Sequence, residues 1–289
     1  MESCSLWRTI ALFIKKPALR LRGLSCIKSL CADFFGLQYR LALRSRVPIY
    51  AVDHPLDSRI PFIPEQVGVY LHFVGFWVEL LGALLRQYGE AAVEPVKDFV
   101  ATMQRLYSFA AVVYRQALST TERPGCRRKA RLMLIHLFDP HLFCVPSLHI
   151  MVVISTYTQF RAIVQRLNRE DNAAADNAAV RSGALAIAES VLYLKQHSIN
   201  CVAAALYAMT RFDRRLFPPE EALTFAGDLF AQSALDALDK RLISAAIIDL
   251  YRRFCAEGAH AERWEEPLLH FLHQQKPVRS AAHKKKEQN

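Results

Sequence analysis

Two histidines stand out because each follows a polar break and opens an apolar run. His149 lies in Pro146-Ser-Leu-His149, and His197 lies in Lys195-Gln-His197. If both runs are helices that begin on the same side of the molecule, the two imidazoles can converge. One ring could then attack a phosphorus atom while the other protonates the leaving oxygen. Such a transfer also needs cations or hydrogen-bond donors that hold the phosphate oxygens.

The run that contains His149 is the longest uncharged window of the chain. Residues 140–160 contain no Asp, Glu, Lys or Arg, and no other window resembles a membrane-spanning helix as well in length and apolarity. Proline is tolerated in the first turn of a helix, and a neighbouring serine can cap it. We therefore expect a helix that begins near Pro146, with Ser147 and His149 at its positive end, which suits an anion. Taken alone, His149 also fits an ordinary helix-terminal or core histidine.

The composition indicates an all-helical chain that lies between the soluble and the membrane classes. Of the 289 residues, 52% are hydrophobic and 22% are charged, and the mean hydropathy is +0.09. Gly and Pro are sparse, and no pair of alternating runs is joined by a turn signal such as Asn-Gly. These features favour helices over strands.

The net charge of +10 predicts an anionic partner, such as phospholipid head groups or a phosphorylated substrate. Nucleic acid is not expected, because aromatic residues are not interleaved with the basic runs. The seven cysteines form no C-x-x-C pair, so we interpret them as small buried side chains rather than as a disulfide framework or a zinc site. The first residues do not resemble a signal peptide, because their basic residues follow the apolar part.

Along the chain we expect four parts. These are a basic leader (1–30) that either lies on an anionic membrane surface or is loosely ordered, a helical domain (31–215), a C-terminal helical extension (216–275) and a basic disordered tail (276–289). Within the domain, the pattern predicts helices over 66–85, 99–118, 182–194 and 198–210, a charged connection over 86–98, and a linker or frayed helix over 161–180. In the extension, one amphipathic helix is indicated by Leu235, Leu238, Leu242, Ala246, Leu250 and Phe254.

The order and spacing of three short motifs resemble the type-2 phosphatidic acid phosphatase superfamily, the lipid-phosphate phosphatases related to vanadium haloperoxidases. That family carries K-x6-R-P, then P-S-x-H, then S-R-x5-H-x3-D. The second motif matches at Pro146, Ser147 and His149. The resemblance covers roughly residues 50–212 and includes a Lys195-Gln-His197 phrase found near the inositol-phosphoceramide synthase-like branches.

The first and third motifs match in spacing but depart from the family at three positions. Arg123-Pro124 is present, but Gln116 stands at the lysine position. Ser190 and His197 are present, but Val191 replaces the arginine and Cys201 the aspartate. A carboxylate normally fixes the tautomer of a catalytic imidazole, a role that a thiol fills poorly and the neighbouring Asn200 only in part.

Carried over residue by residue, the resemblance implies that His197 is the nucleophile and His149 the acid. Arg123, Ser147 and Ser190 would bind phosphate oxygens, and Lys195 would stand in for the cation missing at position 191. The chemistry would use no metal and no cofactor.

The resemblance further implies a membrane-embedded bundle of about six core helices, followed by a C-terminal amphipathic helical tail. The activity would be a lipid-phosphate phosphatase or a head-group transferase that acts on a phospholipid or an isoprenoid phosphate. The basic ends favour a multi-pass protein of the inner or cytoplasmic membrane with both termini in the cytoplasm. Two alternatives stay open: an inactive relative with a structural or lipid-binding role, and a soluble helical interaction protein. Nothing in the sequence specifies an oligomeric state.

Overall fold

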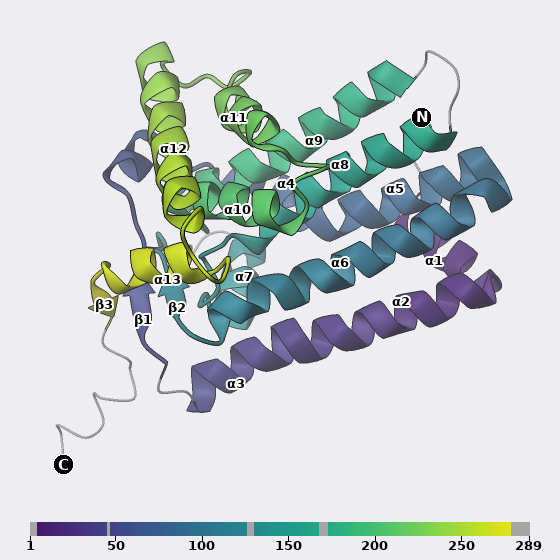
Figure 1. Ribbon diagram of the computed structural model, residues 1–289, viewed down its shortest axis with the longest axis horizontal. Coiled ribbons are helices and arrows are strands. Elements are labelled where there is room, and N and C mark those ends of the chain that lie inside the picture. The colour runs from purple at the N-terminus through teal and green to yellow at the C-terminus, as the bar shows by residue number, and fades with distance from the viewer. Residues whose placement is uncertain (1–4, 45–46, 126–129, 168–172, 279–289) are drawn as a thin grey trace.

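The computed structural model describes residues 5–44, 47–125, 130–167 and 173–278 (Figure 1). These residues are mainly helical, which confirms the expected fold class. Long helices lie side by side along the longest axis of the molecule, and shorter helices gather with three small strands at one end. The candidate site lies at this end, where several loops meet.

The N-terminal part is a helical hairpin rather than a loose leader. It consists of α1 (Leu6–Lys15), α2 (Pro17–Leu30), a π-helical turn (Cys31–Phe35) and α3 (Gly36–Arg44). Helix α1 packs against α5 (Phe73–Tyr88), and α2 packs against α6 (Val93–Tyr114). The expectation of a loosely ordered segment is therefore wrong for residues 6–30, whereas residues 1–4 lie outside the described part.

The core is organised around α8 (Leu148–Leu167), whose side chains are buried along most of its length. Helices α5, α6, α9 (Ala173–Tyr193) and α10 (Ile199–Phe212) pack around it. Apolar residues on every side of α8 explain this position, because a helix that is hydrophobic all round is stable only when it is surrounded. The helix thus places its first turn, which carries His149, inside the protein.

Three short strands tie the loops at the end of the bundle together. The order in the sheet is β2 (Leu118–Thr120), β1 (Ile49–Ala51) and β3 (Pro277–Val278). Strand β1 pairs parallel with β2, with Ile49 opposite Leu118, and antiparallel with β3, with Ile49 opposite Val278. The sequence pattern does not predict this sheet, because the strands are too short to show alternation.

The remaining short elements connect the long helices. They are the single turns η2 (Pro55–Arg59), η3 (Pro64–Gln66) and η4 (Gly89–Ala92), and the helices α4 (Val67–Leu71) and α7 (Ala130–Phe138). The chain reverses between α5 and α6 at η4, where Gly89 has a positive φ of 56° (Figure 1). A glycine adopts this backbone conformation at no steric cost.

The C-terminal extension forms α11 (Pro219–Asp228), α12 (Ala237–Gly258) and α13 (Glu266–His273). Helix α12 docks on α10 through a stripe that includes Ile243, Ile247, Leu250 and Phe254. The amphipathic helix is therefore confirmed, but its stripe differs from the expected one, since Leu238 and Leu242 are exposed. The expected tail starts with β3, and residues 279–289 lie outside the described part.

Two expected boundaries are wrong, and one is confirmed. Residues 161–180 are mostly helical, because α8 runs to Leu167 and α9 starts at Ala173. The charged connection is only η4, since α5 continues to Tyr88 and α6 starts at Val93. The helix expected to begin near Pro146 is confirmed, because α8 begins at Leu148 and the residues before it form the loop that enters this helix.

One stretch of the described residues, Pro64–Tyr114, is long and apolar enough to cross a membrane by length and composition. It is not the uncharged window that contains His149. In its most apolar window, 39% of the residues are buried inside the protein. Because the core helix of a soluble protein can pass the same criterion, this stretch alone gives little support to a membrane span.

Candidate active site

The two histidines singled out in the sequence lie side by side. His197 Nε2 is 3.3 Å from His149 Nδ1, and the ring centroids are 5.4 Å apart. His149 comes from the first turn of α8, and His197 from the turn between α9 and α10. One of these two nitrogens must donate and the other accept, so the rings share one proton.

Aromatic rings and backbone contacts position His149. Its ring stacks on Tyr70, with centroids 4.7 Å apart, and lies 4.4 Å from the ring of Phe73. The loop before α8 is held by the Tyr114 hydroxyl, which donates to the Pro146 carbonyl at 2.6 Å. The Ser147 amide also donates to the Cys201 carbonyl at 3.4 Å, so the two histidine-bearing segments touch directly.

A tight turn and one half-buried carboxyl group position His197. The amides of Gln196 and His197 both donate to the carbonyl of Val191, which closes the turn. The carboxylate of Asp57 accepts from the Ile199 amide at 3.0 Å and thus holds the start of α10. This carboxylate also accepts from the His54 amide, so the turn is fastened to the loop before α4.

The histidine pair lies at the wall of a cavity of about 450 Å³. The lining comes from the helices and turns between α2 and α8 and from the turn between α9 and α10, and most of it is apolar or aromatic. Aromatic lining residues include Phe34, Tyr70, Phe73, Tyr107, Phe138 and Phe143. This size and character fit the hydrocarbon part of an amphiphile beside a small polar group.

The structure brings only some of the predicted phosphate ligands to the pair. Ser147 is buried next to it, and its hydroxyl has no hydrogen-bond partner among the described residues, so the hydroxyl does not cap α8 as expected. Ser190 is turned into its own helix, where its hydroxyl donates to the Ile187 carbonyl at 2.7 Å. The Lys195 ammonium donates to the carbonyls of Asp57 and Ile60 and is thus used to hold a loop.

Arg123 approaches the site but is paired with a carboxylate that the motif pattern does not include. Its guanidinium donates to Asp139 Oδ2 at 2.5 Å. The other oxygen of Asp139 accepts from the Gln38 amide at 2.7 Å and from the His141 backbone at 2.9 Å. A cation that is already neutralised attracts a phosphate less than a free one does.

Asp139 belongs to a buried polar cluster with His141 and Cys144. Burial alone would raise the pKa of Asp139, but hydrogen bonds from His141 and the charge on Arg123 hold it below its usual range. Burial would lower the pKa of His141, but Cys144 and Asp139 raise it to about 9. Burial would likewise raise the pKa of the Cys144 thiol, which its contacts with Cys201 and His141 hold well below the ordinary value.

Asp139 and His141 carry a signal that the three motifs do not use. Both stand a few positions before the P-S-x-H tetrapeptide, in the phrase Asp139-Pro-His141. An acidic residue next to a histidine at the edge of an uncharged window indicates a polar group that the fold has to accommodate. What the sequence cannot show is that Gln38 and Arg123, from distant segments, complete the cluster.

The three departures from the motif pattern have different structural settings. Gln116 is exposed and donates to its own turn at the Val112 carbonyl. Val191, which stands at the arginine position of the motif, is fully buried, so this position carries no positive charge. Cys201 is buried against Cys144. Asn200 donates to the carbonyls of Val52 and Asp53.

Within the described part of the chain, no carboxylate takes the place of the missing aspartate. His197 Nδ1 is buried and has no hydrogen-bond partner among these residues. If His197 attacks through Nε2, its proton must be on Nδ1, where it finds no strong acceptor. This is the weakest point of the site as a phosphotransfer centre.

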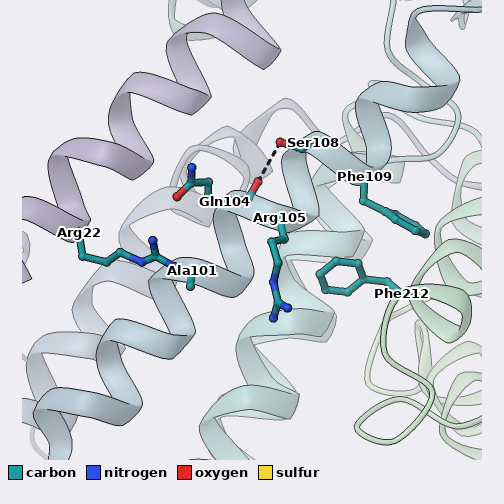
Figure 2. Close-up of a pocket in the computed structure, with 7 residues that line it drawn as sticks. All are labelled: Arg22, Ala101, Gln104, Arg105, Ser108, Phe109 and Phe212. Carbon is teal, nitrogen blue, oxygen red and sulfur yellow. Dashed lines mark hydrogen bonds between the residues drawn. The ribbon is translucent and has the colours of Figure 1, made fainter.

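A second hollow of about 660 Å³ lies between α2, α6 and the end of α10 (Figure 2). Arg22 and Arg105 extend into it beside Phe109 and Phe212. Its lining contains no acid–base pair, so it does not compete with the histidine pair as a reaction centre. Among the described residues, no group of three or more histidine, cysteine, aspartate or glutamate side chains could hold a metal ion.

Comparisons with known proteins found no relative of this chain. The chain matches no protein-family model, no curated protein and no solved structure. Its function is therefore inferred from the residues and their geometry alone.

Proposed function

We propose that this protein transfers the phosphoryl group of a lipid phosphate through a phosphohistidine at His197. The observation that carries the proposal is the distance of 3.3 Å between His197 and His149 at the wall of an apolar cavity. Two imidazoles in contact can supply a nucleophile and a proton donor, which are the groups that this reaction needs. Burial and the neighbouring His197 lower the pKa of His149 to about 3, so His149 acts as the acid only when the bound phosphate stabilises its protonated form.

The reaction balances with these two side chains alone. The lone pair on His197 Nε2 attacks phosphorus, and the bond from phosphorus to the ester oxygen breaks. The leaving alkoxide takes a proton from His149 and departs as an alcohol. Water, or the hydroxyl group of an acceptor, then gives its proton to His149 and attacks phosphorus, and the bond from phosphorus to His197 Nε2 breaks with its electron pair returning to the imidazole. Phosphate or a new phosphate ester leaves, so the same site can hydrolyse or transfer.

Substrate binding must open the histidine pair. A phosphoryl group and its leaving oxygen do not fit between nitrogens 3.3 Å apart, so one ring has to turn. The buried hydroxyl of Ser147 has no partner among the described residues, but Ser147 does not line the cavity, so it could donate to a phosphate oxygen only if the turned ring opened the space between them. The aromatic walls of the cavity would take up the hydrocarbon chain.

A second candidate is a lipid-binding relative that does not catalyse. Two observations favour it: Arg123 is neutralised by Asp139, and His197 Nδ1 has no acceptor among the described residues. In that case the cavity would hold a lipid, and the histidine pair would be a polar contact at its wall.

Phosphate release from phosphatidic acid and from a prenyl phosphate distinguishes the two candidates. With the phosphotransferase, His197→Ala abolishes release, and His149→Ala lowers the rate by about 10²–10⁴-fold, the usual loss on removal of a general acid. His270→Ala is the matched control, because this exposed imidazole contacts Glu257 and Gln274 in the C-terminal helices, away from the cavity. Equal release by wild type and both site variants would exclude phosphotransfer for these substrates.

A further inference from the structure

An exposed apolar stripe follows the helix that α2, the π-helical turn and α3 form together. Its large side chains are spaced three, eight, four and four residues apart and are between 42% and 81% exposed, namely Leu24, Ile27, Phe35, Tyr39 and Leu43. This spacing places them on one side of a continuous helix. A stripe of this kind has no partner inside the described part of the protein, since the opposite side of α2 already packs on α6.

Helix α7 extends the apolar surface. Met133, Leu134, Leu137 and Phe138 are between 49% and 72% exposed. Helices α3 and α7 are joined by the Tyr39 hydroxyl, which donates to the Phe138 carbonyl, and by the bond between Gln38 and Asp139. The stripe and α7 therefore meet.

The cavity that contains the histidine pair opens where they meet. Phe35, Leu71, Val74 and Phe138 line this cavity, yet each is at least 42% exposed, so they form its rim. Exposure of an apolar rim to water is unfavourable, and a contiguous apolar surface of this kind marks a site where a partner or a membrane binds. We refer to the stripe, the exposed side of α7 and this rim together as the rim face.

The charges around the stripe are almost all positive. Residues 6–44 contain eight basic residues and one acidic residue. On α2, the exposed side chains of Arg20 and Lys28 stand four positions before and four positions after Leu24, so they share its side of the helix, and neither forms a salt bridge with a carboxylate among the described residues. Unpaired cations beside an apolar stripe complement an anionic lipid surface, whereas a second copy of this basic chain would be repelled.

We propose that the rim face lies in the interface of an anionic bilayer, so that the cavity exchanges its ligand directly with the membrane. The stripe would enter the region between head groups and acyl chains, and the basic side chains would contact the head groups. The hydrocarbon chain of a ligand would then pass over the rim without crossing water. This surface is independent of the phosphotransfer proposed above, because docking requires no reaction.

Vesicle flotation of the full chain tests the proposal. Wild type is mixed with vesicles of phosphatidylcholine alone, or with about 30% phosphatidylserine, which gives the negative surface potential of a cytoplasmic leaflet. We expect binding to the anionic vesicles to be about 10- to 100-fold stronger than to the neutral ones, and to weaken with salt. No phosphate monoester is present, so a failure of catalysis does not affect the result.

Two paired variants locate the surface. Ile27→Ser/Leu43→Ser removes two exposed members of the stripe and should lower binding to anionic vesicles by about tenfold or more. Leu238→Ser/Leu242→Ser removes two exposed leucines on α12 and is the control that should bind like wild type.

Four outcomes would overturn the proposal. They are no binding of wild type to either vesicle, equal binding to both vesicles, equal loss in the two variants, or a dimer in light scattering that the stripe variant dissociates. Equal binding to neutral vesicles would indicate insertion rather than docking, and a dimer would indicate that a second copy covers the stripe.

Discussion

His197 and its neighbour Lys195 have different partners at the site, because the imidazole of His197 contacts His149 and the ammonium group of Lys195 contacts a distant loop. Lys195 and Gln196 define a recognisable phrase with His197, and the structure brings the His197 ring to His149. The side chain of Lys195 points away from the histidine pair, because its ammonium group donates to the carbonyls of Asp57 and Ile60. Those carbonyls come from a segment more than 130 positions away, so no local pattern could have shown this use of the lysine.

Asp139 is the residue that most changes the interpretation of the site. It neutralises Arg123 and binds Gln38 and the His141 backbone at the same time. A carboxylate among such partners stabilises the fold in its ionised form only.

The Asp139→Asn variant should therefore be less stable than wild type in a pH-dependent manner. The pKa of Asp139 in the folded state lies below the ordinary carboxyl pKa of 3.8. The contribution of Asp139 to the free energy of unfolding is therefore fully present above pH 3.8 and is lost as the pH falls through the lower, folded-state pKa. Thermal unfolding from neutral pH down to about pH 2 measures this. We expect a deficit of roughly 1–3 kcal/mol near neutral pH, the usual loss when a donor that is largely buried loses its partner, and this deficit should shrink below about pH 4 because the Asp139 side chain is 32% exposed and is ionised only above that pH in the unfolded chain.

The control for this stability measurement is Asp228→Asn. Asp228 also pairs with one arginine, Arg181, at 2.6 Å, but its side chain is 42% exposed. Its loss should therefore cost much less, within about 1 kcal/mol. Equal deficits in the two variants, or a deficit of Asp139→Asn that does not change with pH, would contradict the role given to Asp139.

The same substitution should strengthen phosphate binding. A neutral amide in place of the Asp139 carboxylate would leave Arg123 with an uncompensated charge next to the cavity, so inorganic phosphate or vanadate should bind about tenfold more tightly. Isothermal titration of wild type and the Asp139→Asn variant with vanadate measures the difference. Unchanged or weaker binding would mean that Arg123 does not face the ligand.

At the scale of elements, helix type and approximate position were predictable, but helix partners were not. The apolar period placed α10 to within two residues of its ends, whereas α5 starts seven residues later and α6 six residues earlier than predicted. For α12 the pattern indicated a helix but not its bounds. The charged residues over 86–98 and 161–180 misled the prediction, because charges on one side of a surface helix interrupt a pattern without interrupting the helix. The strands escaped detection because their two or three residues gain their stability from pairing with distant segments.

Contacts between α10 and α12 hold the C-terminal helices on the core. The Tyr207 hydroxyl donates to the Trp264 carbonyl at 2.9 Å and lies against Gly258, where an added Cβ would be 2.3 Å from that hydroxyl. Tyr207 is buried and cannot move away freely. The absence of a side chain at position 258 is therefore required for this packing.

The Gly258→Ala variant should lose roughly 1–3 kcal/mol of unfolding free energy because of this overpacking. Gly227→Ala is the matched control, because Gly227 lies within α11 and an added Cβ has no neighbour within 4 Å. It should be neutral or gain up to about 1 kcal/mol from helix propensity. Chemical denaturation of both variants measures the difference, and a neutral Gly258→Ala would show that α12 does not approach Tyr207 as described.

For the molecule as a whole, the sequence indicated a helical protein with two converging histidines. The geometry adds an apolar cavity beside them and an exposed apolar rim around its mouth. Motif spacing cannot reveal such a cavity, because its walls come from the π-helical turn and from several helices across half of the chain. The same geometry shows what the site lacks, a carboxylate partner for His197 Nδ1 among the described residues. Composition and motifs alone could not have decided between a working and an inactive site.

The most direct test of the proposed reaction is to trap the phosphohistidine. The full chain is mixed with a radiolabelled lipid phosphate, quenched in alkali within milliseconds to seconds, and digested for mass spectrometry. The proposal predicts a label on His197 that is stable in base and labile in acid, and that is absent from the His197→Ala variant. In the His149→Ala variant the label should accumulate when the substrate has a good leaving group, because such a group departs without a proton from the acid. A chain that hydrolyses the substrate without labelling His197, or that carries the label equally in His197→Ala, would contradict the account.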